Sequence, residues 1–407
     1  MLQEDVEDYD VVIAGGGIGG LTLACGLAAN GRTTCVLESR PSLARSKRGL
    51  ALQPNGLAAL DNLGLLTQVL GIGHRTGRVT WCEIGHGKLA TFDYSILDQP
   101  HNFLLTIIPS ELEVILREEL SRRGGVLHES TSFLGVKHEP NGQLRVTALR
   151  NGEAIEYSAR ILVGADGENS NCRKTLGVRT RIKESANQYL FMLIGPVDAI
   201  RQEARQYFTR GKMLGLYPTP TSTYVFYYLP KRKFNDLRSR GLESFKKELG
   251  GIEPEVSDSL ENLQSWEDVA YAAPKRVDVE NWVVDGAALM GDAVHALDPA
   301  WAQGANLSLQ DAVVLADTIE RCFESGDFSA NALRSYELQR RKHAKFVQDQ
   351  SERTAQVTTT ENRFYYWLGK RLIRNTGADP GLMKIALSAS SGLTNHISMR
   401  DRIRFLI

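Results

Sequence analysis

The first residues that could do chemistry are the glycines of GGGIGG, residues 15–20. They fit GxGxxG at Gly15, Gly17 and Gly20: the first permits a tight turn, the second lets the backbone approach a pyrophosphate, and the third lets a helix pack on a strand. Ile18 lies within this loop, and the N-terminus of the helix that follows would offer free amides and a partial positive charge to phosphate groups. The stretch predicts a dinucleotide site rather than an ordinary glycine-rich turn.

An acidic residue follows where a nucleotide ribose would need it. Glu38, with Ser39 beside it, ends the next apolar run and could accept hydrogen bonds from a ribose hydroxyl. A carboxylate there would repel a 2′-phosphate, which argues against NADP in this site. The glycine motif and Glu38 by themselves do not distinguish an NAD site from an FAD site.

Two later segments carry further candidate ligands. VGADG, residues 163–167, continues to Ser170 and Arg173, so the segment reads DGxxSxxR from Asp166. GDA, residues 291–293, follows an apolar strand far downstream and supplies Asp292. Either acid alone could be a turn residue that caps a helix. Both together, after a glycine loop, indicate one composite site.

The elements that must position these residues have an α/β pattern. Residues 9–14 and 33–38 are short apolar runs around a helical pattern at 21–30, which predicts a βαβ unit in a parallel sheet covered on both faces. Helical patterns recur at 55–63 and 110–123. Residues 126–163 read as short strands with turns at Asn141-Gly142 and Asn151-Gly152. Residues 160–165 form another buried strand.

The pattern changes between residues 181 and 281. Aromatic strands there predict a separate antiparallel sheet with one or two small helices near 235–249. After this region, apolar runs typical of buried strands occur again. We therefore expect a discontinuous Rossmann-type domain (residues 1–180 and 282–345), an inserted antiparallel-sheet domain (181–281) and a C-terminal helical region (346–407).

Composition excludes several classes of protein. A chain of 407 residues with 42% apolar residues and zero net charge fits a globular protein, with no electrostatic footprint for nucleic acid. No apolar run approaches the roughly 20 residues of a membrane-spanning helix, and the acidic N-terminus is unlike a signal peptide. Five scattered cysteines without CxxC favour reduced thiols. We expect a cytoplasmic protein without an integral membrane segment or a metal site.

In order and spacing, the three segments resemble the FAD-dependent group A monooxygenases, the family typified by p-hydroxybenzoate hydroxylase. The resemblance covers residues 10 to about 348. It implies FAD as cofactor, NADPH or NADH as co-substrate, and O2 and a small aromatic molecule as the other reactants. It also implies that a C4a-hydroperoxyflavin performs the oxygenation, which explains why no nucleophile stands out.

The resemblance also assigns candidate ligands. Asp292 matches the acid that binds the ribityl chain, and a carboxylate suits hydroxyl ligands. Asp166 and Arg173 match a segment associated with FAD and the pyridine nucleotide, and Arg48 matches an arginine near the FAD phosphates. A helix starting near Gln303 would direct its dipole at the flavin edge where negative charge develops. The residues of this start are Gln303, Gly304, Ala305 and Asn306.

Two positions depart from the family pattern. Many relatives place an Arg or Gln where this chain has Pro109, and Arg117 lies too far along the helix to substitute obviously. The family commonly has a glycine where this chain has Ala302. An alanine there is tolerated if its φ is negative and strained if its φ is positive.

The substrate should lie between the aromatic strands and the flavin. Pro299 and Trp301 would flank the flavin ring, and Tyr217 and Tyr228 are candidates for orienting the substrate, although an aromatic stripe is more often ordinary packing. Alternation puts Tyr224 on the face of Tyr228, without showing which face meets the substrate. The aromatic enrichment favours a flat, largely apolar substrate that is hydroxylated or epoxidised.

Other readings stay open at this point. A reductase or halogenase could use the same fold, but tryptophans 81, 266, 282, 301 and 367 never form the WxWxIP segment of halogenases. A non-catalytic FAD-binding accessory protein is a further alternative.

Several polar and aromatic residues are better explained by structural roles than by chemistry. His295 fits a structural turn better than a base, and Glu337, Arg340 and Arg341 resemble a solvated helical face. The basic, aromatic stretch at 363–377 could touch a membrane weakly, but packing against the rest of the protein is the preferred reading.

Overall fold

The computed structural model describes residues 6–231 and 233–406. Its N-terminal β–α–β unit consists of β1 (Glu7–Ala14), α1 (Ile18–Ala29) and β2 (Thr34–Leu37). β1 and β2 are parallel, with Val11 opposite Thr34. The inner half of β1 and all of β2 are buried, as a parallel sheet covered on both faces requires. The glycine loop therefore leaves the carboxyl end of a central strand, as predicted.

The first sheet has eight strands and is assembled from distant parts of the chain. Its main order is β19-β20-β11-β1-β2-β8, and β10 and β9 extend it as an antiparallel meander from β11. β20 pairs in parallel with β11, so the chain returns to this sheet after a long excursion, as expected for a discontinuous domain. The bounds are β8 (Val126–His128), β9 (Thr131–His138), β10 (Leu144–Arg150), β11 (Glu153–Gly164), β19 (Val283–Val284) and β20 (Ala287–Leu289).

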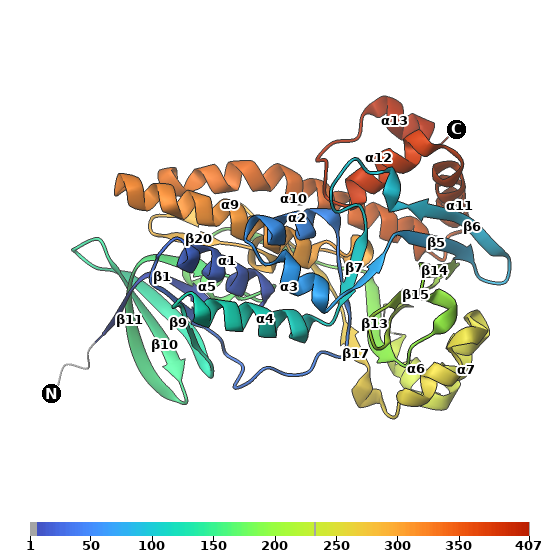
Figure 1. Cartoon of the computed structure of the whole chain (residues 1–407), viewed down its shortest axis with the longest axis horizontal. Coiled ribbons are helices and arrows are strands. Elements are labelled where there is room, and N and C mark those ends of the chain that lie inside the picture. Colours follow the sequence, from blue (N-terminus) through green and yellow to red (C-terminus); the bar gives the residue numbers. More distant parts are fainter. Residues whose placement is uncertain (1–5, 232, 407) are drawn as a thin grey trace.

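Helices cover this sheet and carry the later segments. α1 packs against α9 and α4, and α9 and α10 run side by side along the molecule (Figure 1). A small third sheet has three strands in the order β3-β7-β4, all within residues 50–107. The bounds are β3 (Leu50–Leu52), α2 (Pro54–Asn62), α3 (Leu66–Gly71), β4 (His74–Thr76), β7 (Leu104–Ile107), α4 (Pro109–Arg122), α5 (Asn171–Thr175), α8 (Asp292–His295), α9 (Gly304–Ser325) and α10 (Ala330–Thr358).

The second sheet has seven strands in the order β17-β13-β16-β15-β14-β5-β6. Residues 181–281 supply five of them: β13 (Asn187–Ile194), β14 (Ala204–Thr209), β15 (Lys212–Pro218), β16 (Thr223–Pro230) and β17 (Ala270–Ala272). The other two, β5 (Arg78–Glu83) and β6 (Gly87–Asp93), come from the segment assigned from sequence to the first domain. β5 pairs in parallel with β14, a long-range partner that no local pattern reveals.

The two faces of the second sheet have different partners. Val225, Tyr227 and Leu229 pack with Phe245 in the core beneath α6 (Phe234–Ser239) and α7 (Leu242–Ile252). Tyr224, Phe226 and Tyr228 face the other side of the sheet. The alternation predicted from sequence is thus confirmed.

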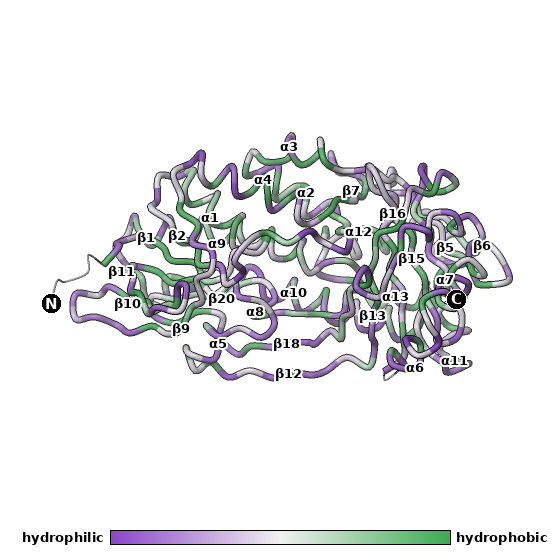
Figure 2. Tube along the Cα trace, turned by 90° about the horizontal axis from the view of Figure 1, so that it is seen from below, coloured by the Kyte–Doolittle hydropathy of each residue, from purple (hydrophilic) through white to green (hydrophobic). Residues whose placement is uncertain are grey.

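Two strands connect the bodies that contain the main sheets. β12 (Thr180–Glu184) and β18 (Lys275–Val279) pair antiparallel at the entry and exit of the insertion, and Figure 2 shows them as long, mostly hydrophilic traces between the two bodies. The same view shows apolar stretches concentrated in the strands and helices of the interior.

The chain ends in α11 (Arg363–Ala378), α12 (Pro380–Ser390) and α13 (Met399–Arg404) at the second-sheet end of the molecule (Figure 1). α11 packs on β6, and its Lys370 Nζ binds Glu83 Oε1 at 2.8 Å. Phe364 and Trp367 on the same helix are exposed, so a weak membrane contact stays a prediction. Among the described residues, no helix combines the length and apolarity needed to cross a bilayer.

Candidate cofactor and substrate site

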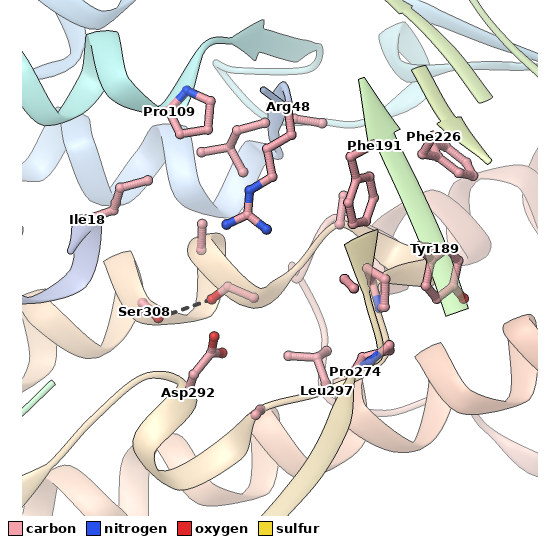
Figure 3. Close-up of a pocket in the computed structure, with 18 of the residues that line it drawn as sticks. Ile18, Arg48, Pro109, Tyr189, Phe191, Phe226, Pro274, Asp292, Leu297 and Ser308 are labelled. Atoms are coloured by element: carbon pink, nitrogen blue, oxygen red, sulfur yellow. Dashed lines mark hydrogen bonds between the residues drawn. The ribbon is translucent and has the colours of Figure 1, made fainter. Parts of the chain in front are cut away.

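One cavity of about 660 Å³ links the two sheets. At one end it is lined by the glycine loop, residues 17–20, and at the other by aromatic side chains of the second sheet. Figure 3 shows Ile18 on one side of this space and Phe191, Phe226 and Tyr189 on the other. A volume of this size suits a sizeable small-molecule ligand.

The glycine loop has the geometry that a phosphate cradle needs. Gly15 has φ +113°, and a Cβ there would lie 2.3 Å from the carbonyl oxygen of Ala165. A Cβ on Gly20 would lie 2.0 Å from the carbonyl oxygen of Gly15, so the turn and the start of α1 both require glycine. A Cβ on Gly17 would meet no atom within 4 Å. The middle glycine therefore faces open space, which leaves its backbone accessible to a ligand.

Glu38 is held by the protein itself. Its Oε2 accepts from Gly16 N at 3.0 Å, and its Oε1 accepts from Arg40 N at 2.8 Å. Burial raises the pKa of Glu38, but hydrogen bonds from Arg40 and Gly16 outweigh it and hold the pKa below the ordinary value. Glu38 is buried and does not line the cavity, and Ser39 beside it is exposed. Glu113, bound by Arg40 Nη2 at 3.0 Å, reaches the cavity instead.

Arg48 and Asp292 enter the middle of the cavity from opposite sides (Figure 3). Arg48 comes from the loop before β3, and Asp292 is the first residue of α8. Enclosure within the protein raises the pKa of Asp292, while the nearby charges of His295 and Arg48 oppose this rise. The Asp292 carboxylate makes no hydrogen bond within the described residues, so its acceptor oxygens are available to a ligand.

The N-terminus of α9 forms another part of the wall. Gly304 and Ala305 line the cavity, and the first helical hydrogen bond runs from Leu307 N to Gln303 O at 2.8 Å. The preceding amides have no partner within the helix, as at any helix start. The backbone at the start of α9 therefore faces the cavity.

The side chains of Gln303 and Asn306 turn away from the cavity. Gln303 Nε2 donates to Ser390 O at 2.7 Å, and Asn306 Oδ1 accepts from Gln53 N at 3.0 Å. Both are fully buried. The structure therefore gives these two predicted ligands a role in fixing the start of α9.

Ala302, which lines the cavity just before this helix, has φ +51° and ψ +38°. This is the left-handed region, which is unfavourable for alanine. Its carbonyl oxygen accepts from Asn306 Nδ2 at 2.7 Å, which helps to hold the strained conformation. The departure from glycine noted in the sequence therefore has a structural cost.

Asp166 and Arg173 lie behind the cavity wall. Asp166 Oδ2 accepts from Asn171 N at 2.7 Å and Cys172 N at 2.9 Å, and so caps α5. Arg173 Nη1 donates to Ala293 O at 2.7 Å, which ties the α5 segment to α8. Their neighbours Gly167 and Glu168 line the cavity instead.

A buried ionic network holds α8 in place, and the sequence interpretation missed it. Asp311 of α9 accepts from His295 Nε2 at 2.5 Å, from Arg340 Nε at 2.8 Å and from Gly291 N at 3.0 Å. Burial raises the pKa of Asp311, but His295 and Arg340 outweigh it and hold the pKa far below the ordinary value. His295 is thus structural.

The interpretation of Glu337, Arg340 and Arg341 as a solvated helical face was wrong for Glu337 and Arg340, because both are buried. The sequence did contain a signal for this network. Asp311 lies on the same apolar face of its helix as Leu307 and Leu315, and a buried acid requires a partner.

The aromatic wall of the cavity comes from β13, β15 and β16. Tyr217 lines it, and the face of β16 that meets the cavity carries Tyr224 and Phe226. Tyr228 shares that face but lies behind Tyr189, with ring centroids 6.0 Å apart. The sequence interpretation missed Tyr189 and Phe191, because their strand carried no marker beyond apolar alternation.

The two residues expected beside the flavin ring have different positions. Pro299 lines the cavity, but Trp301 does not. Trp301 Nε1 donates to Thr354 Oγ1 at 2.9 Å, and its ring packs on Phe346 of α10. Pro109, the other departure from the family pattern, also lines the cavity.

Comparison with known proteins identifies the family. The model of the FAD binding domain family matches residues 8–351. The chain belongs to the FAD-dependent group A monooxygenases. This monooxygenase is 28% identical to 6-methylpretetramide 4-monooxygenase of Streptomyces rimosus over 365 residues, 89% of this chain and 85% of the relative. It is also 28% identical to aurachin C monooxygenase/isomerase of Stigmatella aurantiaca over 381 residues, 91% and 94% of the two chains.

Solved structures show the same fold at lower identity. The p-nitrophenol 4-monooxygenase PnpA of Pseudomonas putida DLL-E4 superposes with a TM-score of 0.82 at 18% identity, covering 97% of this chain and all of that one. PqsL of P. aeruginosa, in complex with 2-aminobenzoylacetate, gives 0.78 at 22% identity, covering 88% and 99%. The α/β fold with its FAD-binding domain and antiparallel sheet is thereby confirmed.

The cavity of this monooxygenase fits FAD. The open space at Gly17, the free amides at the starts of α1 and α9, the Arg48 cation and the unpaired carboxylate of Asp292 offer the ligand types that diphosphate, ribityl and flavin groups need. These groups lie along one continuous space, as an elongated dinucleotide requires.

Proposed function

We propose that the protein uses FAD and NADPH or NADH to insert one atom of O2 into a flat, largely apolar aromatic or polycyclic small molecule, by hydroxylation or epoxidation. The observation that carries this proposal is the single cavity that joins the glycine loop to the aromatic wall. A cofactor at one end and a substrate at the other would share one enclosed space.

Each part of the wall has a role in this proposal. The amides of residues 17–20 and the Arg48 guanidinium would hold the phosphates, and Asp292 would accept hydrogen bonds from the ribityl hydroxyls. The amides of Gly304 and Ala305 would stabilise negative charge on the flavin. Bound flavin supplies electron transfer from the nicotinamide and the activation of O2.

The character of the cavity supports a neutral substrate. Of the residues that line it in the described parts of the chain, only Arg48 is a cation, and phosphate binding would occupy it. The second-sheet end is aromatic and would exclude water from the reacting groups. Two relatives are themselves named as monooxygenases, which supports oxygenation over reduction or halogenation.

The test is a substrate screen followed by isotope labelling. The purified protein should carry or take up FAD, and its oxidation of NADPH and NADH should rise with neutral fused aromatic compounds more than with aromatic carboxylates. With ¹⁸O2, the product should gain one labelled oxygen. Product oxygen derived from water would contradict the proposal, and a protein that cannot be loaded with FAD would favour a non-catalytic accessory role.

A further inference from the structure

A buried polar pair interrupts the aromatic wall of the cavity. Gln206 on β14 and Tyr217 on β15 both line the cavity and are only 7% and 8% exposed. Gln206 Nε2 donates a hydrogen bond to the Tyr217 hydroxyl. Gln206 Oε1 is buried and has no hydrogen-bond partner within residues 6–231 and 233–406. The pair therefore presents one acceptor that the protein leaves unused.

No neighbouring group among the described residues donates a hydrogen bond to the Gln206 amide oxygen. Its neighbours across the sheet are Gly215 on β15 and Trp81 on β5. The ring of Phe226 covers Gly215, where a Cβ would lie 1.9 Å from the ring. A buried amide oxygen without a partner is unfavourable unless a ligand supplies the missing donor.

Two other polar groups on the same wall, the hydroxyls of Tyr189 and Thr359, are already satisfied. The Tyr189 hydroxyl donates to Asp298 Oδ1 at 2.8 Å, and Thr359 Oγ1 donates to Ala355 O at 2.6 Å. The hydrogen bond from Gln206 leaves the proton of the Tyr217 hydroxyl free. Burial raises the pKa of Tyr217 to about 12, although the hydrogen bond from Gln206 opposes the rise, so the hydroxyl stays protonated at neutral pH. The pair thus offers one acceptor and one donor side by side.

We propose that Gln206 and Tyr217 form the polar anchor of the substrate end of the cavity and select a neutral aromatic substrate that carries an N–H or O–H donor next to a hydrogen-bond acceptor. Cyclic lactams and phenols with a neighbouring carbonyl have this chemistry. A carboxylate lacks the donor and would face the Gln206 oxygen without a compensating cation. The inference rests on the proposed function, because it places the substrate against the aromatic wall.

The test compares three bicyclic probes on the FAD-loaded protein by titrating the flavin absorbance. 2-Quinolone has the adjacent N–H and C=O groups, N-methyl-2-quinolone lacks the donor, and 4-methyl-2-quinolone carries an added methyl group but keeps the donor. We expect both N–H probes to bind about 10-fold more tightly than the N-methyl probe, as one hydrogen bond to a buried group provides. Equal affinities in the unmodified protein, or no binding of any probe, would overturn the inference.

Variants separate recognition from stability. Gln206→Met should reduce the preference for the N–H probes to less than 2-fold, and Tyr217→Phe should also reduce it. Tyr207→Phe is the matched control, because Tyr207 is the next residue on β14 but faces the other core, where its hydroxyl binds Glu253. That variant should lose stability and keep the preference. A preference unchanged in Gln206→Met would refute the assignment.

Failure of this inference is distinguishable from failure of the proposed function. If ¹⁸O enters a product but the probes bind without discrimination, only the anchor is wrong. If the probes discriminate but no substrate gains labelled oxygen, the oxygenation proposal fails and the binding site stands.

Discussion

The network around Asp311 gives the sharpest stability prediction. Its carboxylate is fully buried and accepts hydrogen bonds from His295, Arg340 and the Gly291 amide. Asp311→Ala would remove all three and leave the Arg340 guanidinium buried with weaker contacts, to Gln310 Oε1 at 3.2 Å and Leu307 O at 3.4 Å. Breaking a buried ion pair from one side costs about 3–5 kcal/mol.

That loss should be visible in two measurements. With an unfolding entropy of about 2.1 cal/mol/K per residue, the loss corresponds to a fall in Tm of about 4–6 °C for a chain of this length. Gly291 precedes Asp292, so the variant should also hold FAD less tightly, by about 10-fold. Thermal unfolding would measure the fall in Tm, and fluorescence titration of FAD would measure the loss of affinity.

A surface ion pair on the same helix as Arg340 provides the control. Asp349 Oδ1 binds Arg276 Nη1 at 2.8 Å, its side chain is 39% exposed, and Arg276 keeps Asp278 as a partner. Asp349→Ala should cost less than about 1 kcal/mol and leave FAD affinity unchanged. If Asp311→Ala stays within about 1 kcal/mol of the unmodified protein and retains FAD equally well, the network does not position α8 as argued.

Three further predictions concern single residues. Asp292→Ala should raise the FAD dissociation constant at least 10-fold, because the variant loses a charge-assisted hydrogen bond to the cofactor. Unchanged flavin occupancy after gel filtration would refute this role for Asp292. Ala302→Gly should raise the free energy of unfolding by about 0.5–1 kcal/mol, because glycine adopts the left-handed region without strain but loses more chain entropy; a destabilised variant in urea unfolding would contradict this. Burial lowers the pKa of His343 to about 4. In the unfolded chain this histidine has a pKa of about 6.5 and therefore takes up a proton at a higher pH than in the folded protein. The free energy of unfolding should therefore fall by about 2–3 kcal/mol as the pH drops from 7 to 4. His343→Leu should flatten that part of the pH profile, and an unaltered profile would count against the assignment.

Local signals were enough for the cofactor class and much of the fold. Gly15 and Gly20 are required by backbone geometry and close packing, which are properties of the loop itself. Asn151 and Gly152 both have positive φ, as their turn type demands, and so mark the β10–β11 hairpin. The alternation in β16 likewise predicted its two faces. These features depend on a few consecutive residues.

Side-chain destinations were less predictable from the sequence. Asp166, Arg173, Gln303 and Asn306 occupy motif positions, but all four bind the protein's own backbone or side chains in the structure. A motif indicates that a segment lies near the ligand; the rotation of its element decides which atoms face that ligand. Trp301 shows the same limit, because one turn of backbone directs its ring onto α10.

The sequence by itself determined the α/β pattern, the glycine turn, the acid after the apolar strand and the family, because each depends on short-range periodicity or on backbone conformations that few residues accept. Only the tertiary structure decided that β5 and β6 join the second sheet, that Arg340 is buried against Asp311, and that Gln206 lines the cavity with a buried amide oxygen that has no hydrogen-bond partner among the described residues. Those outcomes depend on partners far apart in the chain, and packing fixes them only when the separate elements meet.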